Sequence, residues 1–148
     1  KIFMGVCMEK VAKVEWDDSY LLNIPEIDGQ HKRLIAIANE LYDAVAGSPD
    51  DYKLKMSKVL KSLTDYTVYH FTEEEKFMAK YGYPATSTHK VAHDAFVREV
   101  EIQIRRLDGG TQEDALKLYS FIVNWVLMHI ARADRIWGKF VSQKLEQE

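Results

Sequence analysis

Apolar residues recur along most of the chain at steps of three and four, which is the pattern of amphipathic helices. Glycine, proline and small polar residues interrupt this pattern between segments. The helical segments that remain are 27–46, about 50–80, about 87 to the turn at 108–110, and 111 to beyond 137. Long helices joined by short turns pack against their neighbours in opposite directions. We therefore predict an all-α fold, an antiparallel up-down-up-down four-helix bundle.

Residues 1–26 lie before the first helical segment and include Trp16, Tyr20 and Ile24. We predict that they form an N-terminal arm laid across the bundle. A chain of 148 residues has the length of one domain and can bury a sizeable core. We therefore expect a single domain over 1–148, with the arm at 1–26 and the four-helix bundle at 27–148.

The five histidines lie on the apolar faces of these segments. His31 is in line with Ile27 and Leu34, and His70 continues a stripe that includes Leu63. The same phase holds for the other three, His89, His93 and His129. Every histidine of the chain is therefore predicted to face the interior of the bundle.

The histidines also share a depth in the predicted bundle. In this topology, the start of one helix lies level with the ends of its neighbours. His31, His89 and His93 lie early in their helices, whereas His70 and His129 lie late in theirs. We therefore expect all five to meet in one buried layer at the same end of the bundle.

Buried imidazoles are costly unless their nitrogens are paired. A metal ion takes one lone pair from each ring, and carboxylates or carbonyls can then bind the other nitrogen. Glu74 follows His70 by four residues and keeps the phase of the apolar stripe. We expect the flanking Glu73 and Glu75 to be solvated.

Asp134 fits this pattern less well, because it follows His129 by five residues, which is about 140° around an ideal helix. That angle leaves two interpretations open, ligation and a surface ion pair with Arg132 or Arg135. Five imidazoles with two carboxylates are too many ligands for one metal ion and suit two. Mixed imidazole–carboxylate sites with spare positions favour iron.

Other kinds of site lack the residues that they need. In HKVAH (89–93), Lys90 stands where a zinc protease requires glutamate. The Glu-x-x-His pairs of ferritin-like di-iron proteins do not occur in the sequence. Neither a nucleophile triad nor a phosphate-binding glycine loop is visible.

Charge and composition exclude further partners. A formal net charge of −3 and a pI of about 6.0 argue against nucleic acid, which needs a basic face. The longest uncharged run, 118–131, is too short to span a bilayer, so we expect no membrane insertion of this domain. Cys7 is the only cysteine, which favours a reducing, cytoplasmic setting.

Four motifs together resemble the motif set of the bacterial hemerythrins: IDGQH (27–31), HFTEEE (70–75), HKVAH (89–93) and HIARAD (129–134). That set is a lone histidine on the first helix, His-x3-Glu on the second, His-x3-His on the third and His-x4-Asp on the fourth. The similarity covers roughly residues 14 to 140. It implies that Asp134 is a ligand, which the helical spacing alone leaves open.

The resemblance implies a di-iron centre bridged by the carboxylates of Glu74 and Asp134 and by an oxo or hydroxo group. It assigns His89, His93 and His129 to one iron. It assigns His31 and His70 to the other iron, where one position stays open for dioxygen. The residues that match the family's apolar oxygen pocket are Leu34, Phe71, Trp125, Val126 and Ile130.

The function that this implies is reversible dioxygen binding, for oxygen transport, storage or delivery. The matched pocket contains no acid, base or polar donor, so we predict no catalytic residues and no enzymatic activity. Two alternatives stay open: an oxygen- or redox-sensing domain of a signalling protein, and a di-iron reductase of peroxide or nitric oxide. Dioxygen is the expected partner, with a signalling or oxygen-consuming protein as a further candidate.

Overall fold

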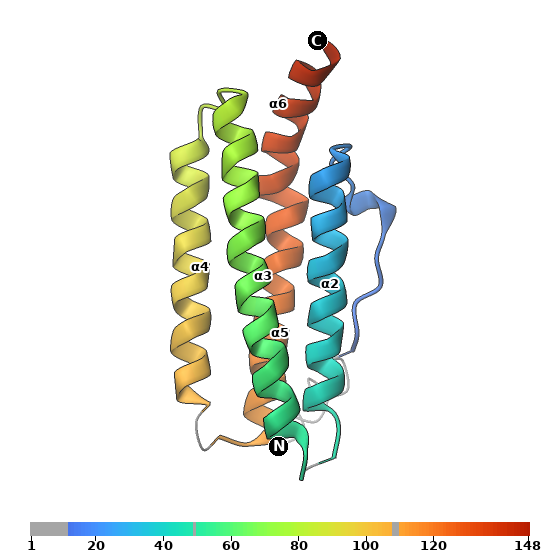
Figure 1. The fold of residues 1–148 in the computed structure, drawn as a ribbon, viewed down its shortest axis with the longest axis vertical. Coiled ribbons are helices and arrows are strands. Elements are labelled where there is room, and N and C mark those ends of the chain that lie inside the picture. The colour runs from blue at the N-terminus through green and yellow to red at the C-terminus, as the bar shows by residue number, and fades with distance from the viewer. Residues whose placement is uncertain (1–11, 49, 108–109) are drawn as a thin grey trace, which may run out of the picture.

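Four helical columns run antiparallel to one another in the computed structural model, which describes residues 12–48, 50–107 and 110–148 (Figure 1). The last column is unbroken from α5 through a π-helical turn, η2, into α6. The described elements are η1 (Asp18–Tyr20), α2 (Pro25–Val45), α3 (Tyr52–Lys80), α4 (Thr86–Arg106), α5 (Gln112–His129), η2 (Ile130–Asp134) and α6 (Arg135–Glu146). The predicted all-α, up-down-up-down bundle is confirmed.

Local sequence signals set the helix ends. Helix α2 begins at Pro25, two residues before the predicted start of the bundle, because proline at the first helical position gives up only a backbone N–H that has no helical partner. Thr111 and Asp114 form a reciprocal capping box at the start of α5. Gly82 has φ 69° just after α3, where Tyr83 N donates to Met78 O at 2.8 Å; this closes the helix as a Schellman motif does.

The described part of the predicted arm, residues 12–24, is fastened to the bundle at several points. Val14 and Asn39 of α2 exchange two hydrogen bonds of 2.8 Å, and the Tyr119 hydroxyl donates to Ala12 O at 2.8 Å. Leu22 and Ile24 are buried. Residues 1–11 of the arm lie outside the described residues. The observed part therefore lies against the bundle as predicted.

The interior contains two apolar clusters. The large cluster fills the half of the bundle that holds the α2–α3 turn and the start of α5. Its buried members are Leu34, Ile37, Ala38, Leu41, Val45, Tyr52, Leu60, Leu63, Phe71, Phe96, Val100, Ala115, Leu118, Tyr119, Ile122 and Val123. The small cluster lies toward the opposite end, beside the α3–α4 turn, and consists of Leu22, Ile24, Ile27, Met78, Trp137 and Val141.

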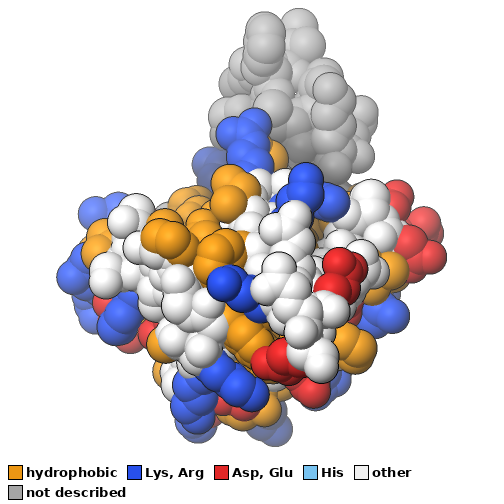
Figure 2. All heavy atoms as spheres, turned by 90° about the horizontal axis from the view of Figure 1, so that it is seen from above, with side chains coloured by type: hydrophobic (Ala, Val, Ile, Leu, Met, Phe, Trp, Pro, Cys, Tyr) orange, Lys and Arg blue, Asp and Glu red, His pale blue; other side chains and the backbone are white. Residues whose placement is uncertain are grey.

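Figure 2 looks onto the end of the bundle that holds the α3–α4 turn and the C-terminus. Acidic, basic and apolar side chains are mixed there, whereas all five histidines are buried inside. Within the described ranges, none of the helices combines the length and the apolar character that crossing a membrane requires.

Candidate metal centre

A layer of seven buried polar side chains lies between the two apolar clusters. We call it the polar layer; its members are His31, His70, Glu74, His89, His93, His129 and Asp134. On α2 the layer follows Ile27 of the small cluster and precedes Leu34 of the large one, which fixes its depth. The structure thus brings together every residue that the sequence singled out for metal binding. Which of them bind a metal stays a prediction.

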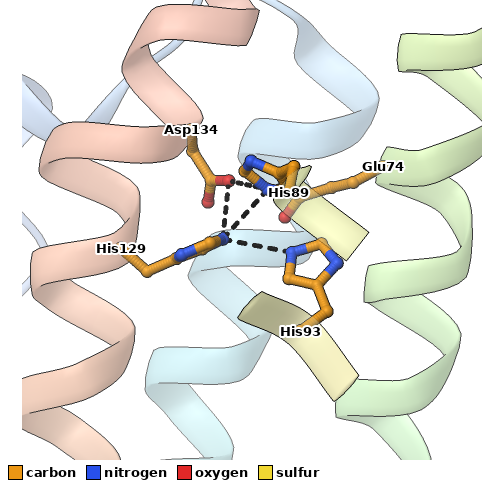
Figure 3. Close-up of side chains that lie close together, drawn as sticks. All are labelled: Glu74, His89, His93, His129 and Asp134. Carbon is orange, nitrogen blue, oxygen red and sulfur yellow. Dashed lines mark hydrogen bonds and ion pairs between the residues drawn. The ribbon is translucent and has the colours of Figure 1, made fainter. Parts of the chain in front are cut away.

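The ligand atoms of the polar layer fall into two sets, within each of which all atoms lie within 4.8 Å of one another. The three-histidine group consists of Glu74, His89, His93, His129 and Asp134. Figure 3 shows these five side chains pointing at one another; Glu74 comes from α3, His89 and His93 from α4, and His129 and Asp134 from the last column. The two-histidine group consists of His31, His70, Glu74 and Asp134. Two metal positions that share both carboxylates match this arrangement.

The π-helical turn η2 explains how Asp134 reaches the layer. An α-helix would turn Asp134 away from His129, but a π-helix closes its hydrogen bonds from residue i to i+5. The wider turn at Ile130–Asp134 brings the carboxylate back to the side of the imidazole. Asp134 Oδ1 then lies 3.1 Å from His129 Nε2, and Asp134 is fully buried. The surface ion pair left open by the sequence is therefore excluded.

Each carboxylate turns one oxygen toward each group of histidines. Glu74 Oε1 lies against His70 Nε2 and 3.4 Å from His31 Nε2, whereas its Oε2 lies 3.5 Å from His89 Nε2. Asp134 Oδ2 lies 3.2 Å from His31 Nε2, whereas its Oδ1 lies 3.1 Å from His89 Nε2. This is the orientation that a bridging carboxylate needs between two cations.

The Nε2 atoms of the three-histidine group also point at one another. His129 Nε2 lies 3.0 Å from His89 Nε2 and 3.1 Å from His93 Nε2 (Figure 3). His93 Nδ1 lies 2.9 Å from Glu75 Oε2, and because a carboxylate only accepts, Nδ1 carries the proton of a neutral ring. The Nε2 lone pair of His93 therefore faces inward, where a cation would satisfy it.

Charge is balanced inside the polar layer. Burial lowers the pKa of His31 and of His89, but hydrogen bonds with Asp134 and Glu74 outweigh this and raise both pKa values to about 9. Burial raises the pKa of Glu74 and of Asp134, but the facing histidines outweigh it. They hold the pKa of Glu74 well below its usual range and that of Asp134 at about 2. Two imidazolium ions thus face two carboxylates at neutral pH, and a bound metal must displace those protons.

The residues present fit a metal cation. Burial lowers the pKa of His93 to about 3, so this ring offers a lone pair at neutral pH. Among the described residues, the buried His31 Nδ1 has no hydrogen-bond partner, and Asp134 Oδ2 meets only His31 Nε2, at 3.2 Å. Imidazole and carboxylate ligands in these proportions suit iron better than they suit the softer metals that prefer thiolate ligands.

Three residues beside the layer were not predicted as part of the site. Gln30 Oε1 accepts from His70 Nδ1 at 2.7 Å. The fully buried Trp137 Nε1 donates to Glu74 Oε2 at 2.9 Å and to Asp134 Oδ1 at 3.0 Å. Glu75 was expected to be solvated, and this was wrong: its side chain is 22% exposed and pairs with His93. Only the general need of a metal-bound imidazole for a second partner could have indicated Gln30 and Glu75, and it does not apply to Trp137, which bonds to carboxylates.

The five residues matched to an oxygen pocket lie around the polar layer. Phe71 stacks flat on the ring of His93, with centroids 3.7 Å apart, and Trp125 stacks on the ring of His129 at 4.4 Å. Leu34, Phe71 and Ile130 are buried, whereas Trp125 and Val126 are half-buried. Two of the five therefore also hold imidazole rings in place. Their role toward dioxygen stays a prediction.

Comparison with known proteins places the chain among metal-binding relatives. The family model described as "Hemerythrin HHE cation binding domain" matches residues 22–141, a span that includes the whole polar layer. The bacteriohemerythrin of Clostridium acetobutylicum is 34% identical over 123 residues, which cover 81% of this chain and 95% of that protein.

Two further comparisons extend over most of the chain. The bacteriohemerythrin of Stenotrophomonas maltophilia is 30% identical over 138 residues, which cover 93% of this chain and 87% of that protein. A solved wild-type hemerythrin superposes with a TM-score of 0.75 at 29% identity, over 88% of this chain and 99% of that one. The likeness therefore includes the fold as well as the motifs.

Proposed function

The chain belongs to the hemerythrin family, and from this we propose that it binds dioxygen reversibly at two iron ions held by the polar layer. One observation carries the proposal: two sets of ligand atoms share Glu74 and Asp134 at the centre of the bundle. The shared carboxylates would hold two cations side by side, and the buried histidines would supply the remaining ligands.

The two groups differ in the number of ligands that they offer. His89, His93 and His129 with the two carboxylates give five protein ligands to one iron. His31 and His70 with the same carboxylates give four to the other. The two-histidine group therefore offers one protein ligand fewer, and this is where we place dioxygen. Two ferrous ions held there would supply one electron each for the reversible binding of dioxygen.

The surrounding chain favours binding over turnover. The buried side chains of Leu34, Phe71 and Ile130 exclude water from the centre and offer no polar group to a substrate. A catalytic centre would need an acid, base or hydrogen-bond donor at this place, in reach of the reacting atoms. Trp137, the buried N–H donor beside the carboxylates, already bonds to both of them. We therefore propose that the protein carries dioxygen and is not an enzyme.

The test is metal and gas binding by the reconstituted protein. Anaerobic loading with ferrous iron should give about two irons per chain. Air should change the optical spectrum of the reduced protein, and removal of dioxygen should restore it over repeated cycles. Metal analysis that finds one zinc and no iron, or a spectrum that never returns after air, would reject the proposal.

Ligand variants test the assignment of residues to the two irons. His89→Ala or His129→Ala should impair iron loading more than His31→Ala, because the first two belong to the fully ligated position. Leu41→Ala is a matched control, since Leu41 is buried in the large cluster away from the layer. Equal iron retention in all three histidine variants would contradict the assignment.

A further inference from the structure

The two groups of histidines are held from outside by different chemical partners. In the three-histidine group, His93 Nδ1 donates to a carboxylate oxygen, Glu75 Oε2, at 2.9 Å. In the two-histidine group, His70 Nδ1 donates to an amide oxygen, Gln30 Oε1, at 2.7 Å. Both acceptors come from helices that carry ligands themselves, α3 and α2. The geometry is alike in the two groups, but the charge of the acceptor is not.

A charged acceptor changes the imidazole that bonds to it. A carboxylate draws the Nδ1 proton more strongly than an amide does, and hydrogen bonds to an ionised partner are roughly twice as strong as neutral ones. The opposite nitrogen, Nε2, gains electron density and becomes a stronger metal ligand. More electron density at a ligand stabilises ferric iron more than ferrous iron, which lowers the reduction potential of the metal that it binds.

Burial raises the pKa of the Glu75 carboxyl, and the nearby Lys90 ammonium opposes this shift. Lys90 Nζ lies 3.8 Å from Glu75 Oε1 and 3.1 Å from Asp94 Oδ2, so the glutamate is the inner end of a chain of charges on α3 and α4. Lys90 itself is 55% exposed, which leaves the outer end of the chain in solvent. The neighbouring Glu73 is not a member of the polar layer and pairs instead with Lys76 at 3.1 Å.

We propose that Glu75 is a positioning residue that strengthens His93 as a ligand and makes the three-histidine position the tighter and the more easily oxidised of the two. Gln30 gives His70 a neutral partner and leaves the two-histidine position, where the free coordination site lies, the weaker. This inference rests on the proposed pair of metal positions. Gln30 and Glu75 therefore form a pair in which the amide and the carboxylate can be exchanged by mutation.

The experiment exchanges these partners in the full chain. The variants are Glu75→Gln, Gln30→Glu and the double exchange, which restores the formal charge of the parent. Glu73→Gln is the matched control, because it removes the same charge two residues away on α3, from a side chain that pairs with Lys76 and not with a histidine. Two readouts apply to each: zinc(II) affinity of the two positions by chelator competition, and midpoint potentials of the iron-loaded protein by spectroelectrochemistry.

Loss of the carboxylate should weaken one metal position and raise the potential. Removal of an outer partner of a metal-bound histidine costs about 10- to 100-fold in metal affinity, and we expect Glu75→Gln to weaken one zinc position within that range. If the loss is tenfold greater for ferric than for ferrous iron, the midpoint rises by about 59 mV. Gln30→Glu should lower the potential, and the double exchange should reverse the order in which the two zinc ions are released.

Several outcomes would overturn the inference. Glu75→Gln with the zinc affinities and potentials of the parent would show that Glu75 only packs against His93. An equal shift in Glu73→Gln, or a double exchange that restores every parental value, would assign the effect to net charge. If Glu75→Gln fails to fold by circular dichroism, Glu75→Asp takes its place: it keeps the charge but withdraws the carboxylate from His93 Nδ1, so the potential should rise, and parental values would reject the inference. A parent that binds two zinc ions in the stated order but no dioxygen would reject the proposed function alone.

Discussion

The two apolar clusters on either side of the polar layer differ in how they are built. The large cluster draws on α2, α3, α4 and α5 and contains no titratable side chain other than tyrosine. The small cluster draws on the arm, the start of α2, the end of α3, and α6. Its largest member, Trp137, is hydrogen-bonded to Glu74 and Asp134. The first can form from apolar packing alone, whereas the second is tied to the state of the polar layer. We therefore expect metal binding to stabilise the two clusters to different extents.

Metal removal should give the largest effect and should separate the two clusters. A ligand that binds only the folded state adds about 4 kcal/mol to the free energy of unfolding at roughly 1,000 times its Kd. We expect the metal-free protein to lose hydrogen-exchange protection in α6 and at the start of α4, while α5 and the second half of α2 stay protected. Uniform loss of protection in all four columns would remove the distinction between the clusters.

Trp137→Ala should produce the next largest effect. Removal of a buried tryptophan side chain costs about 3–5 kcal/mol, and here it also leaves two carboxylates without their shared donor. Leu41→Ala, in the large cluster, should cost about 2–5 kcal/mol by the same cavity mechanism. Denaturant unfolding measures both losses, and metal analysis distinguishes them, since only Trp137→Ala should weaken iron binding. Trp137→Phe keeps most of the packing and reports the lost hydrogen bonds.

Gly138→Ala should destabilise the small cluster. A Cβ at this position would lie 3.1 Å from Cβ and Cδ1 of Leu22 in the arm, so Leu22 would have to shift. Such overpacking costs about 1–3 kcal/mol, which exceeds the gain of about 1 kcal/mol from alanine in a helix. Gly29→Ala is the control, because a Cβ there meets nothing within 4 Å. Thermal unfolding should therefore show a lower Tm for Gly138→Ala and a higher one for Gly29→Ala; a gain in both would contradict tight packing of the arm.

Thr111→Ala should give the smallest effect, at the end of the bundle farthest from the polar layer. Thr111 Oγ1 accepts from Asp114 N at 3.2 Å, and Asp114 Oδ2 accepts from Thr111 N at 3.0 Å. The variant loses the first bond and keeps the second, so we expect a loss of about 0.5–1 kcal/mol. Denaturant unfolding checks this value. Iron loading should stay that of the parent, and a change in it would link the far end of the bundle to the metal centre.

Helical periodicity and turn residues were sufficient to predict the bundle and the common depth of the five histidines. They could not show whether Asp134 is a ligand. In an ideal α-helix a five-residue step turns the side chain away from the interior, and only the wider π-helical turn brings it back. They also missed Gln30 and Glu75. Gln30 on α2 bonds to His70 on α3, and Glu75 on α3 bonds to His93 on α4. Contacts between helices leave no periodic signal in one sequence.

Trp137 shows the same limit from another side. On α6 it occupies an ordinary core position in the apolar stripe, and its burial could be expected. Its N–H donates to Glu74 on α3, and this contact depends on the position of α6 along its axis relative to α3. Leu22 likewise joins the small cluster only because the arm turns inward there. The sequence thus predicts which side chains face inward, but not which partners they meet.

The π-helical turn also bears on how the chain tolerates a change of length. It holds one residue more than an α-helical path over the same rise would need. Without one alanine of this turn, for example Ala131, the step from His129 to Asp134 would be four residues, which spans about 40° on an ideal helix. Asp134, Trp137 and Val141 would then stay in phase with α5, and α6 could pack as before. The extra residue therefore contributes little to assembly of the bundle. Its effect is on the orientation of His129 and Asp134, the side chains on either side of the turn. We therefore expect a deletion here to leave the fold intact and to change metal affinity.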